Sequence, residues 1–480
     1  MFPRIQQLHD AWNFHSITQF LQHCSLTKNL RAIQVFHAHL LRTGLFFVSP
    51  NLQTKLICTY TTCLDRNSIK TLAYFLKCLD PKNPLPFNSI ISHFSQHGSN
   101  CFALHTLSFM HSNGVFVDSY AFCCALKSIS CLENVFLGKL MHSYIKKSGW
   151  LASVFVGSAL VDFYARMSCI DDAAMVFDEI PMKNTVCVNA LLSGYTGAKM
   201  WDQGVKLVRG MQLLGLEADN FTFSAALQSC TGLYDVELGK QIHGIVMRKV
   251  IEFRTDVFLQ SLLIEMYGKC GLLESAKNVF DMVGYREGEE MRRDVILWTS
   301  ILGVHGKNGN YGEVVRLFNS MLNEGIKPDG VAFLSVISAC AHTGQVDLGM
   351  KFFESMTLNY GLSAGQEHYS CLVDLLCRAG ELERACKLVN DVSNAGYESC
   401  TVSLWGALLS ACTERGNVKL GKAAAQRALE LEPGNVGIYV LLSNMYAKNG
   451  MWDEIEQLRE LMQRRGLKKD IGWSLIDVVT

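Results

Sequence analysis

Apolar residues recur through most of the chain at steps of three to four residues, the spacing of one face of an amphipathic helix. Within 295–329, Trp298, Ile301 and Leu302 follow this spacing, which resumes at Val314 after a break that contains glycines. The pattern predicts two helices joined by a turn. A hairpin of this size cannot bury its apolar face alone, so neighbouring hairpins must stack into a solenoid.

The hairpins repeat along the chain. The segment that starts at Val154 returns at Val257, 103 residues later, and the segment that starts at Val188 returns at Trp298, 110 residues later. A third kind of hairpin carries the sequences LGKLMH and LGKQIH, which stand 101 residues apart. Three unlike units therefore alternate, and this regularity favours one helical array over separate globular domains.

The repeat divides the chain into a short leader, a long array and a C-terminal part. Residues 1–13 form the leader, at best a weak targeting peptide, and 401–478 form the C-terminal part. A charged insertion around Tyr285 lengthens one unit, and we expect it to be a solvated loop. The eleven units of the array are expected at 14–49, 50–83, 84–118, 119–153, 154–184, 185–219, 220–256, 257–294, 295–329, 330–365 and 366–400.

The amino-acid composition and net charge limit the kinds of molecule that the chain is expected to bind. Of 480 residues, 49% are hydrophobic and 18% charged, so the chain can bury a large core. Lys plus Arg and Asp plus Glu both number 44, and a net charge of zero gives no bulk attraction to nucleic acid or lipid. No apolar run approaches the roughly 18 to 20 residues of a membrane span, so we expect no membrane partner. The 18 cysteines are scattered through apolar helices and are expected to be reduced.

Motifs of several enzyme classes are absent. The sequence lacks a phosphate-binding loop and H-E-x-x-H, and it contains no C-x-x-C, which a zinc deaminase needs. His93 and His97 have the spacing of a metal pair, but no third ligand is evident. His142 and His243 recur at one position of the repeat, where packing is the favoured interpretation. We therefore expect no enzyme activity, no cofactor and no metal.

The units that end like Gly325–Asp329 (GIKPD) and begin like Val295–Thr299 (VILWT) resemble the pentatricopeptide repeat (PPR) family. Alternating lengths of 35, 35 and 31 residues resemble its plant subclass with P, L and S units. The resemblance implies an all-α, right-handed solenoid of helix-turn-helix repeats. Residues 401–478 resemble the paired E motifs of this subclass, which are similar to protein-binding tetratricopeptide repeats. Members with a DYW deaminase domain continue far beyond this point, so the resemblance is to the E subgroup.

In the family each unit is similar to a one-base reader, in which the fifth and last residues contact a nucleotide and the second packs against base faces. Asp only accepts hydrogen bonds, which suits uracil and guanine, whereas Asn also donates and tolerates adenine or cytosine. A small hydroxyl at the fifth position resembles the family's purine choice, and Asn its pyrimidine choice. The implied pairs are Thr54 with Asn83 and Ser158 with Asn184 for A, Asn88 with Asp118 and Asn189 with Asp219 for U, and Ser261 with Asp294 and Thr299 with Asp329 for G.

The remaining implied RNA-binding residues are Ser224 with Asp256, an L-type pair for which the code is weak, and Ser370. The target then reads 5′-n-A-U-n-A-U-n-G-G-n-n, with an edited cytidine four nucleotides beyond the base on unit 366–400. Two other interpretations stay open. The aspartates could simply cap helices, and the apolar second residues, Leu85, Phe155, Val186, Phe258 and Ile296, could pack in the core.

The resemblance implies a factor that binds single-stranded organellar RNA and specifies C-to-U editing. It would recruit a DYW-type cytidine deaminase in trans, with other editing factors, through 401–478. Family tendency favours the mitochondrion, with the chloroplast as the alternative. The competing interpretations are an RNA stability, splicing or translation factor, and a protein-binding scaffold of tetratricopeptide type.

Overall fold

The computed structural model describes residues 14–44, 46, 50–63, 69–250, 256–282, 293–394 and 398–468. Within these ranges every regular element is a helix and none is a strand, which confirms the predicted all-α fold. The leader at 1–13, the insertion around Tyr285 and the chain after 468 lie outside the described residues.

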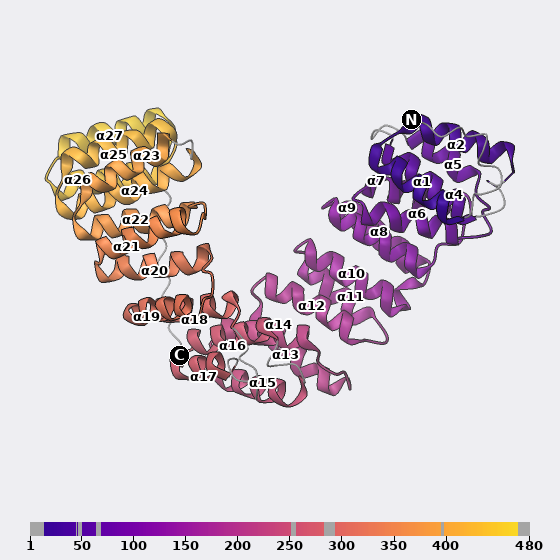
Figure 1. Ribbon diagram of the computed structural model, residues 1–480, viewed down its shortest axis with the longest axis horizontal. Helices are drawn as coiled ribbons and strands as arrows, with labels where there is room; N and C mark the ends of the chain where they lie inside the picture. Colours follow the sequence, from indigo (N-terminus) through magenta and orange to yellow (C-terminus); the bar gives the residue numbers. More distant parts are fainter. Residues whose placement is uncertain are drawn as a thin grey trace. The chain divides into compact units, whose positions relative to one another are not determined.

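The chain divides into two compact bodies, Met1–Leu233 and Tyr234–Thr480, each a stack of helices (Figure 1). The helices of the first body are α1 Phe14–Thr27, α2 Leu30–Arg42, α4 Pro50–Cys63, α5 Ile69–Lys77, α6 Leu85–Gln96, α7 Asn100–Ser112, α8 Ser119–Cys131, α9 Val135–Lys147, η2 Trp150–Ala152, α10 Val154–Arg166, α11 Ile170–Glu179, α12 Thr185–Gly197, α13 Trp201–Leu213 and α14 Asn220–Leu233. Those of the second are α15 Val236–Lys249, α16 Val257–Lys269, α17 Leu273–Met282, α18 Val295–Lys307, α19 Tyr311–Asn323, α20 Gly330–Thr343, α21 Val346–Glu354, η4 Ser355–Asn359, α22 Gln366–Ala379, α23 Leu382–Asn394, α24 Glu398–Arg415, α25 Val418–Leu431, α26 Val436–Lys448 and α27 Trp452–Arg464.

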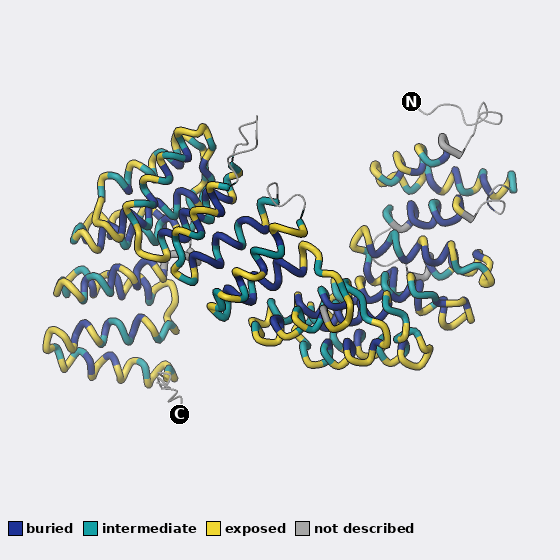
Figure 2. Tube along the Cα trace, turned by 90° about the horizontal axis from the view of Figure 1, so that it is seen from below, coloured by how far each residue is buried: buried dark blue, intermediate teal, exposed yellow. Residues whose placement is uncertain are grey.

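The first helices of successive hairpins pack on one another and form a continuous layer in each body. In the first body this layer is α4, α6, α8, α10, α12 and α14; in the second it is α16, α18, α20, α22, α24 and α26. Along the helices, buried and exposed residues alternate (Figure 2). The buried side supplies the core, which includes Phe87, Phe122 and Phe163 in the first body and Trp298 and Tyr439 in the second. Stacking thus hides the apolar stripe that a single hairpin would expose.

The last boundary of the array differs from the sequence-based expectation. The division placed between 400 and 401 falls inside α24, which begins at Glu398. A unit as short as 154–184 would end at about residue 396. Since a continuous helix belongs to one hairpin, we place the end of this unit before Glu398.

Glycines in the LGK sequences, and Gly349 at the equivalent position of LGM, allow close packing between an L-type unit and the S-type unit that follows. A Cβ added to Gly138 of α9 would overlap the Phe163 ring of α10. In the second body, a Cβ on Gly239 would lie 2.6 Å from the Met266 sulfur, and one on Gly349 the same distance from Leu375 Cδ2. The repeated glycine therefore leaves space into which a side chain of the next unit packs.

Replacing Gly138 by Ala should destabilise the first body by about 1–3 kcal/mol, because the added methyl forces a buried aromatic ring out of place. The matched control is Gly210→Ala on α13, where an added Cβ meets nothing within 4 Å. That change should raise stability by up to about 1 kcal/mol through helix propensity alone. Urea denaturation of both variants measures the difference, and equal effects would contradict the packing role of Gly138.

A half-buried histidine paired with a buried tyrosine also joins L-type to S-type units. The Nδ1 to Oη distances are 3.2 Å for His37 with Tyr60, 3.0 Å for His142 with Tyr164 and 2.9 Å for His243 with Tyr267. Burial lowers the pKa of each imidazole below its ordinary 6.5. Near His142, Glu179 and Asp172 oppose this shift while Lys146 adds to it. These contacts support the packing interpretation of His142 and His243.

Acidification should therefore weaken the fold. Because the folded imidazoles resist protonation, the unfolded chain binds more protons as the pH falls below about 6.5, and stability is lost with falling pH. Phe353 and Leu376 occupy the equivalent positions of the fourth junction. The variant His142→Phe with Tyr164→Leu should lose less stability between pH 7.5 and pH 5.5 than the parent, as urea midpoints will show. An unchanged pH dependence would mean that His142 does not contribute.

Candidate nucleic-acid interface

In seven units the last residue is Asn or Asp and caps the first helix of the next unit, whereas Ser153 makes no such bond. The side-chain oxygens accept backbone N–H groups: Asn83 from Leu85 at 3.1 Å, Asp118 from Ala121 at 2.9 Å, Asn184 from Cys187 at 2.9 Å, Asp219 from Thr222 at 2.8 Å, Asp256 from Leu259 at 3.0 Å, Asp294 from Ile296 at 2.8 Å and Asp329 from Ala332 at 2.9 Å. The capping interpretation is thus correct. It does not exclude a second role, because a carboxylate has two oxygens with several acceptor sites.

In two P-type units the fifth residue reaches that carboxylate directly. Asn88 Nδ2 donates to Asp118 Oδ2 at 2.7 Å, while Oδ1 of the same aspartate caps α8. Asn189 Nδ2 lies 3.0 Å from both oxygens of Asp219. Fifth and last residues, 30 positions apart in sequence, therefore form one polar group at the start of the next helix.

The Asp219 carboxyl is held in its charged form. Burial raises its pKa, but hydrogen bonds from Thr222 and Asn189 outweigh burial, and the net pKa lies below the ordinary 3.8. At neutral pH the group therefore accepts hydrogen bonds and donates none. Such an acceptor suits a base with a ring N–H, such as uracil or guanine.

Units with a hydroxyl at the fifth position are arranged differently. The hydroxyls donate to carbonyl oxygens of their own helices: Ser158 to Val154 at 2.6 Å, Ser224 to Asn220 at 2.7 Å, Ser261 to Phe258 at 2.7 Å and Thr299 to Ile296 at 2.9 Å. Their oxygens keep acceptor capacity, since the proton is committed to the backbone. Thr54 is buried in α4. Ser224 belongs to the first body and Asp256 to the second.

The apolar second residues are not in the core. Leu85 is 68% exposed, Phe155 70%, Val186 63%, Phe258 59% and Ile296 50%. The core-packing interpretation of these side chains is therefore wrong, and each stands at the first turn of its helix. Exposed apolar groups at a regular interval offer surfaces on which flat rings can stack.

Three more exposed second residues were missed in the sequence. Tyr120 and Phe221 are each 50% exposed and Val331 is 56% exposed, all in L-type units. The second-position rule applied to L-type units would have found them.

Pockets on the layer of first helices bring the predicted residues together. One of about 500 Å³ is lined by Leu85, Asn88, Asp118 and Tyr120. Successive second residues flank it, and the Asn and Asp pair lies between them. His93 lines the same pocket, and burial, with His97 nearby, lowers its pKa to about 4, so it is neutral there.

A second pocket, of about 600 Å³, joins two neighbouring units. Its lining includes the predicted polar residues Ser158, Asn184 and Asn189 together with Phe155, Val186 and Phe221. Residues assigned to adjacent bases thus line one cavity, together with three apolar second residues.

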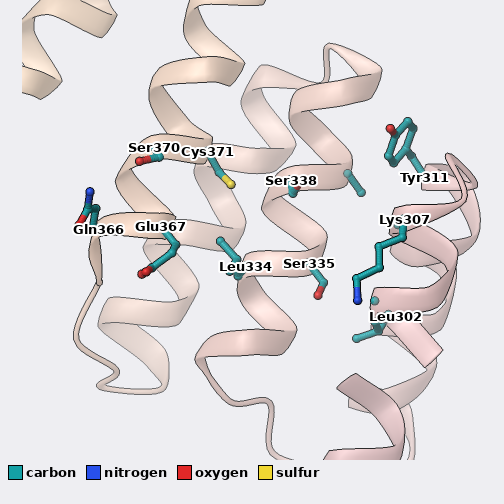
Figure 3. Close-up of a pocket in the computed structure, with 13 residues that line it drawn as sticks. Leu302, Lys307, Tyr311, Leu334, Ser335, Ser338, Gln366, Glu367, Ser370 and Cys371 are labelled. Atoms are coloured by element: carbon teal, nitrogen blue, oxygen red, sulfur yellow. The ribbon is translucent and has the colours of Figure 1, made fainter. Parts of the chain in front are cut away.

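A third pocket, of about 590 Å³, lies in the second body between α18, α20 and α22. Figure 3 shows Lys307 extending from α18, Ser335 from α20 and Ser370 from α22. Leu334 stands at the fifth position of unit 330–365 and presents no hydrogen-bonding group. Of the predicted residues, only Ser370 lines this pocket.

The histidine pair with metal-ligand spacing is stacked ring on ring. The ring centroids of His93 and His97 lie 4.1 Å apart, and no third His, Cys, Asp or Glu joins them among the described residues. The cysteines whose side chains the structure describes are free thiols. In the described part of the chain, no helix has the length and apolar character needed to cross a bilayer.

Comparisons with known proteins identify the repeats. The PPR repeat model matches residues 186–216, 261–284, 331–359 and 367–397, a PPR repeat family model matches 293–342, and an E motif model matches 415–477. The chain is 32% identical over 464 residues to the Arabidopsis thaliana pentatricopeptide repeat-containing protein At1g77170, mitochondrial, with 94% of this chain and 97% of that protein covered. The chain belongs to the pentatricopeptide repeat family. Its E motif is that of the subgroup expected from the sequence.

Other PPR relatives differ in length and organelle. The Arabidopsis PPR protein CRR2, chloroplastic, is 33% identical, with 92% of this chain and 66% of the relative covered. A putative PPR protein, At3g23330, is 34% identical over 87% of this chain, which spans only 56% of that relative's length. The chain thus spans little more than half of several of the relatives it matches.

Solved structures share the fold. The crystal structure of PPR10 from maize superimposes with a TM-score of 0.55, covering 97% of this chain and 71% of PPR10, at 16% identity. PPR10 in complex with an 18-nt psaJ RNA element gives a TM-score of 0.62, with 96% and 70% covered, also at 16% identity.

Proposed function

We propose that this PPR protein binds single-stranded organellar RNA along the layer of first helices and has no catalytic role of its own. The observation that carries the proposal is the repeated arrangement of an exposed apolar second residue beside a polar fifth and last pair, seen in the pockets at Leu85 and Phe155. Flat bases can stack on the apolar groups while the polar pair reads base edges. The RNA in the PPR10 complex supports the same use of the fold.

The bases assigned to the six P-type and S-type pairs give 5′-n-A-U-n-A-U-n-G-G-n-n, and Ser224, Asp256 and Ser370 complete the proposed surface. We further propose that the bound transcript is edited from C to U four nucleotides beyond the last unit. The E motif at 415–477 would then recruit a DYW-type deaminase and other editing factors. Relatives named mitochondrial and chloroplastic support an organelle, and we favour the mitochondrion.

Sequencing of mitochondrial and chloroplast transcripts from a loss-of-function plant and its parent tests this proposal. Loss of editing at one or a few cytidines downstream of the A-U-n-A-U-n-G-G pattern is the expected result. Intact editing with altered abundance or splicing of one transcript would replace the editing role with RNA stabilisation or processing. Binding of the purified protein to peptides but not to the predicted RNA would favour a scaffold.

A further inference from the structure

Two units carry the same Asn and Asp pair but hold the asparagine differently. In unit 185–219, the Thr222 hydroxyl lies 2.8 Å from Asn189 Oδ1. In unit 84–118, the buried Oδ1 of Asn88 has no hydrogen-bond partner among the described residues. The two units are otherwise matched, since each is a P-type unit followed by an L-type unit.

The difference comes from one residue on the next helix. Thr222 and Ala121 both stand three residues after the capping aspartate, and the backbone N–H of each caps onto it. Thr222 is fully buried and adds a hydroxyl that alanine lacks. The same backbone bond therefore caps the helix at both places, and the difference is the hydroxyl. It lies 2.8 Å from Asn189 Oδ1 and 2.9 Å from Asp219 Oδ1, and it accepts the Asp219 backbone N–H at 3.3 Å.

The hydroxyl fixes how the amide can turn. In unit 185–219, both ends of the Asn189 amide are occupied, because Nδ2 faces Asp219 and Oδ1 faces Thr222. In unit 84–118, only Nδ2 of Asn88 is held, by one bond of 2.7 Å to Asp118. An amide with an unoccupied oxygen loses less when it rotates to meet a different base.

The ability of the asparagine amide to rotate affects whether a unit discriminates between uracil and cytosine. Cytosine presents an amino donor where uracil presents a carbonyl acceptor. An amide oxygen that can turn from its buried position toward the base can accept that amino group, whereas an oxygen already bonded to a hydroxyl is less able to do so.

We propose that Thr222 is a positioning residue that sharpens the preference of unit 185–219 for U over C, and that Ala121 leaves unit 84–118 tolerant of C. The proposal rests on the RNA-binding function proposed above, and it adds a residue outside the fifth and last positions to the specificity of a unit. Two units with identical fifth and last residues then differ in how strongly they prefer U over C.

Binding of the purified chain to the RNA 5′-CAUCAUCGGCC-3′ tests the proposal, with U replaced by C at the third or at the sixth nucleotide. We expect the sixth-position change to weaken binding about three- to tenfold more than the third, the worth of one hydrogen bond. Thr222→Val keeps the shape and the backbone N–H that caps onto Asp219 but removes the hydroxyl, with its contacts to Asn189 and Asp219, so it should abolish the excess. Thr222→Ser should retain it.

Ala121→Thr provides the reciprocal measurement in a different helix. It should raise discrimination at the third nucleotide by about three- to tenfold and leave the sixth unchanged. A merely structural effect of either residue would alter affinity for all the RNAs alike. Equal discrimination at both positions in the parent protein, with tight binding to the original RNA, would overturn the role of Thr222 alone. Failure of the parent to bind that RNA would overturn the proposed function and this inference with it.

Discussion

Exchanging two fifth residues, Asn189→Thr together with Thr299→Asn, should exchange the bases preferred at the sixth and ninth nucleotides. The double variant would place a threonine beside Asp219 and an asparagine beside Asp329. It should bind an RNA with G at the sixth position and U at the ninth, and should lose affinity for the original U and G. Each mismatched base costs roughly 1–3 kcal/mol, so two reduce affinity on the order of 10²-fold or more.

The physical reason lies in how the two side chains meet their partners. Asn189 donates to both oxygens of Asp219, whereas the Thr299 hydroxyl donates to its own helix backbone at Ile296. The two groups thus present different donors and acceptors beside the same kind of carboxylate. Exchanging them changes what a base edge meets while both capping aspartates remain.

Titration of both RNAs against both proteins gives the four affinities required. Recovery of tight binding on the exchanged RNA shows that the variant is folded and that its specificity has moved. Asn323→Thr, an exposed change on the second helix α19, is the matched control and should leave both affinities unchanged. If the double variant preferred the original RNA as strongly as the parent does, the proposed code would be wrong for these units.

Much of the fold follows from spacing alone. Apolar steps such as Trp298, Ile301 and Leu302 indicated the helices, and these residues are buried in the structure. The LGK glycine recurs in the sequence, but its structural role depends on a contact with the next unit, which for Gly138 is Phe163. A contact between hairpins cannot be read from the pattern within one hairpin. The expected end of the last unit at 400 lies within α24, which begins at Glu398, so the helical pattern has no break there.

The sequence predicted which positions of each unit form the candidate RNA-binding surface. It did not predict the contacts between the side chains at those positions. Last-position aspartates were open to two interpretations in the sequence, and the structure shows capping together with a contact from Asn88 or Asn189. The exposure of Phe155 could not be decided from its apolar character, which suits a core equally well. Thr222 was overlooked because its partner lies 33 residues earlier, in the preceding hairpin.

Removing the Phe155 ring should weaken RNA binding without weakening the fold. A base stacked on an aromatic side chain contributes about 1–3 kcal/mol, so Phe155→Ala should reduce affinity by roughly five- to a hundredfold. The side chain is 70% exposed, and its loss leaves no core cavity. Phe155 lines the pocket that also contains Ser158 and Asn184, which places the ring beside the polar pair assigned to A.

Two other phenylalanines make the experiment decisive. Phe136 is also 70% exposed but lies on the second helix α9, so Phe136→Ala should leave RNA affinity unchanged. Phe163 is fully buried, and Phe163→Ala should cost about 3–5 kcal/mol of stability. Filter binding and urea denaturation of the three variants separate stacking from packing. Because Phe155 and Phe136 match in residue type and exposure, equal RNA affinities would show that the layer of first helices is not the RNA-binding face.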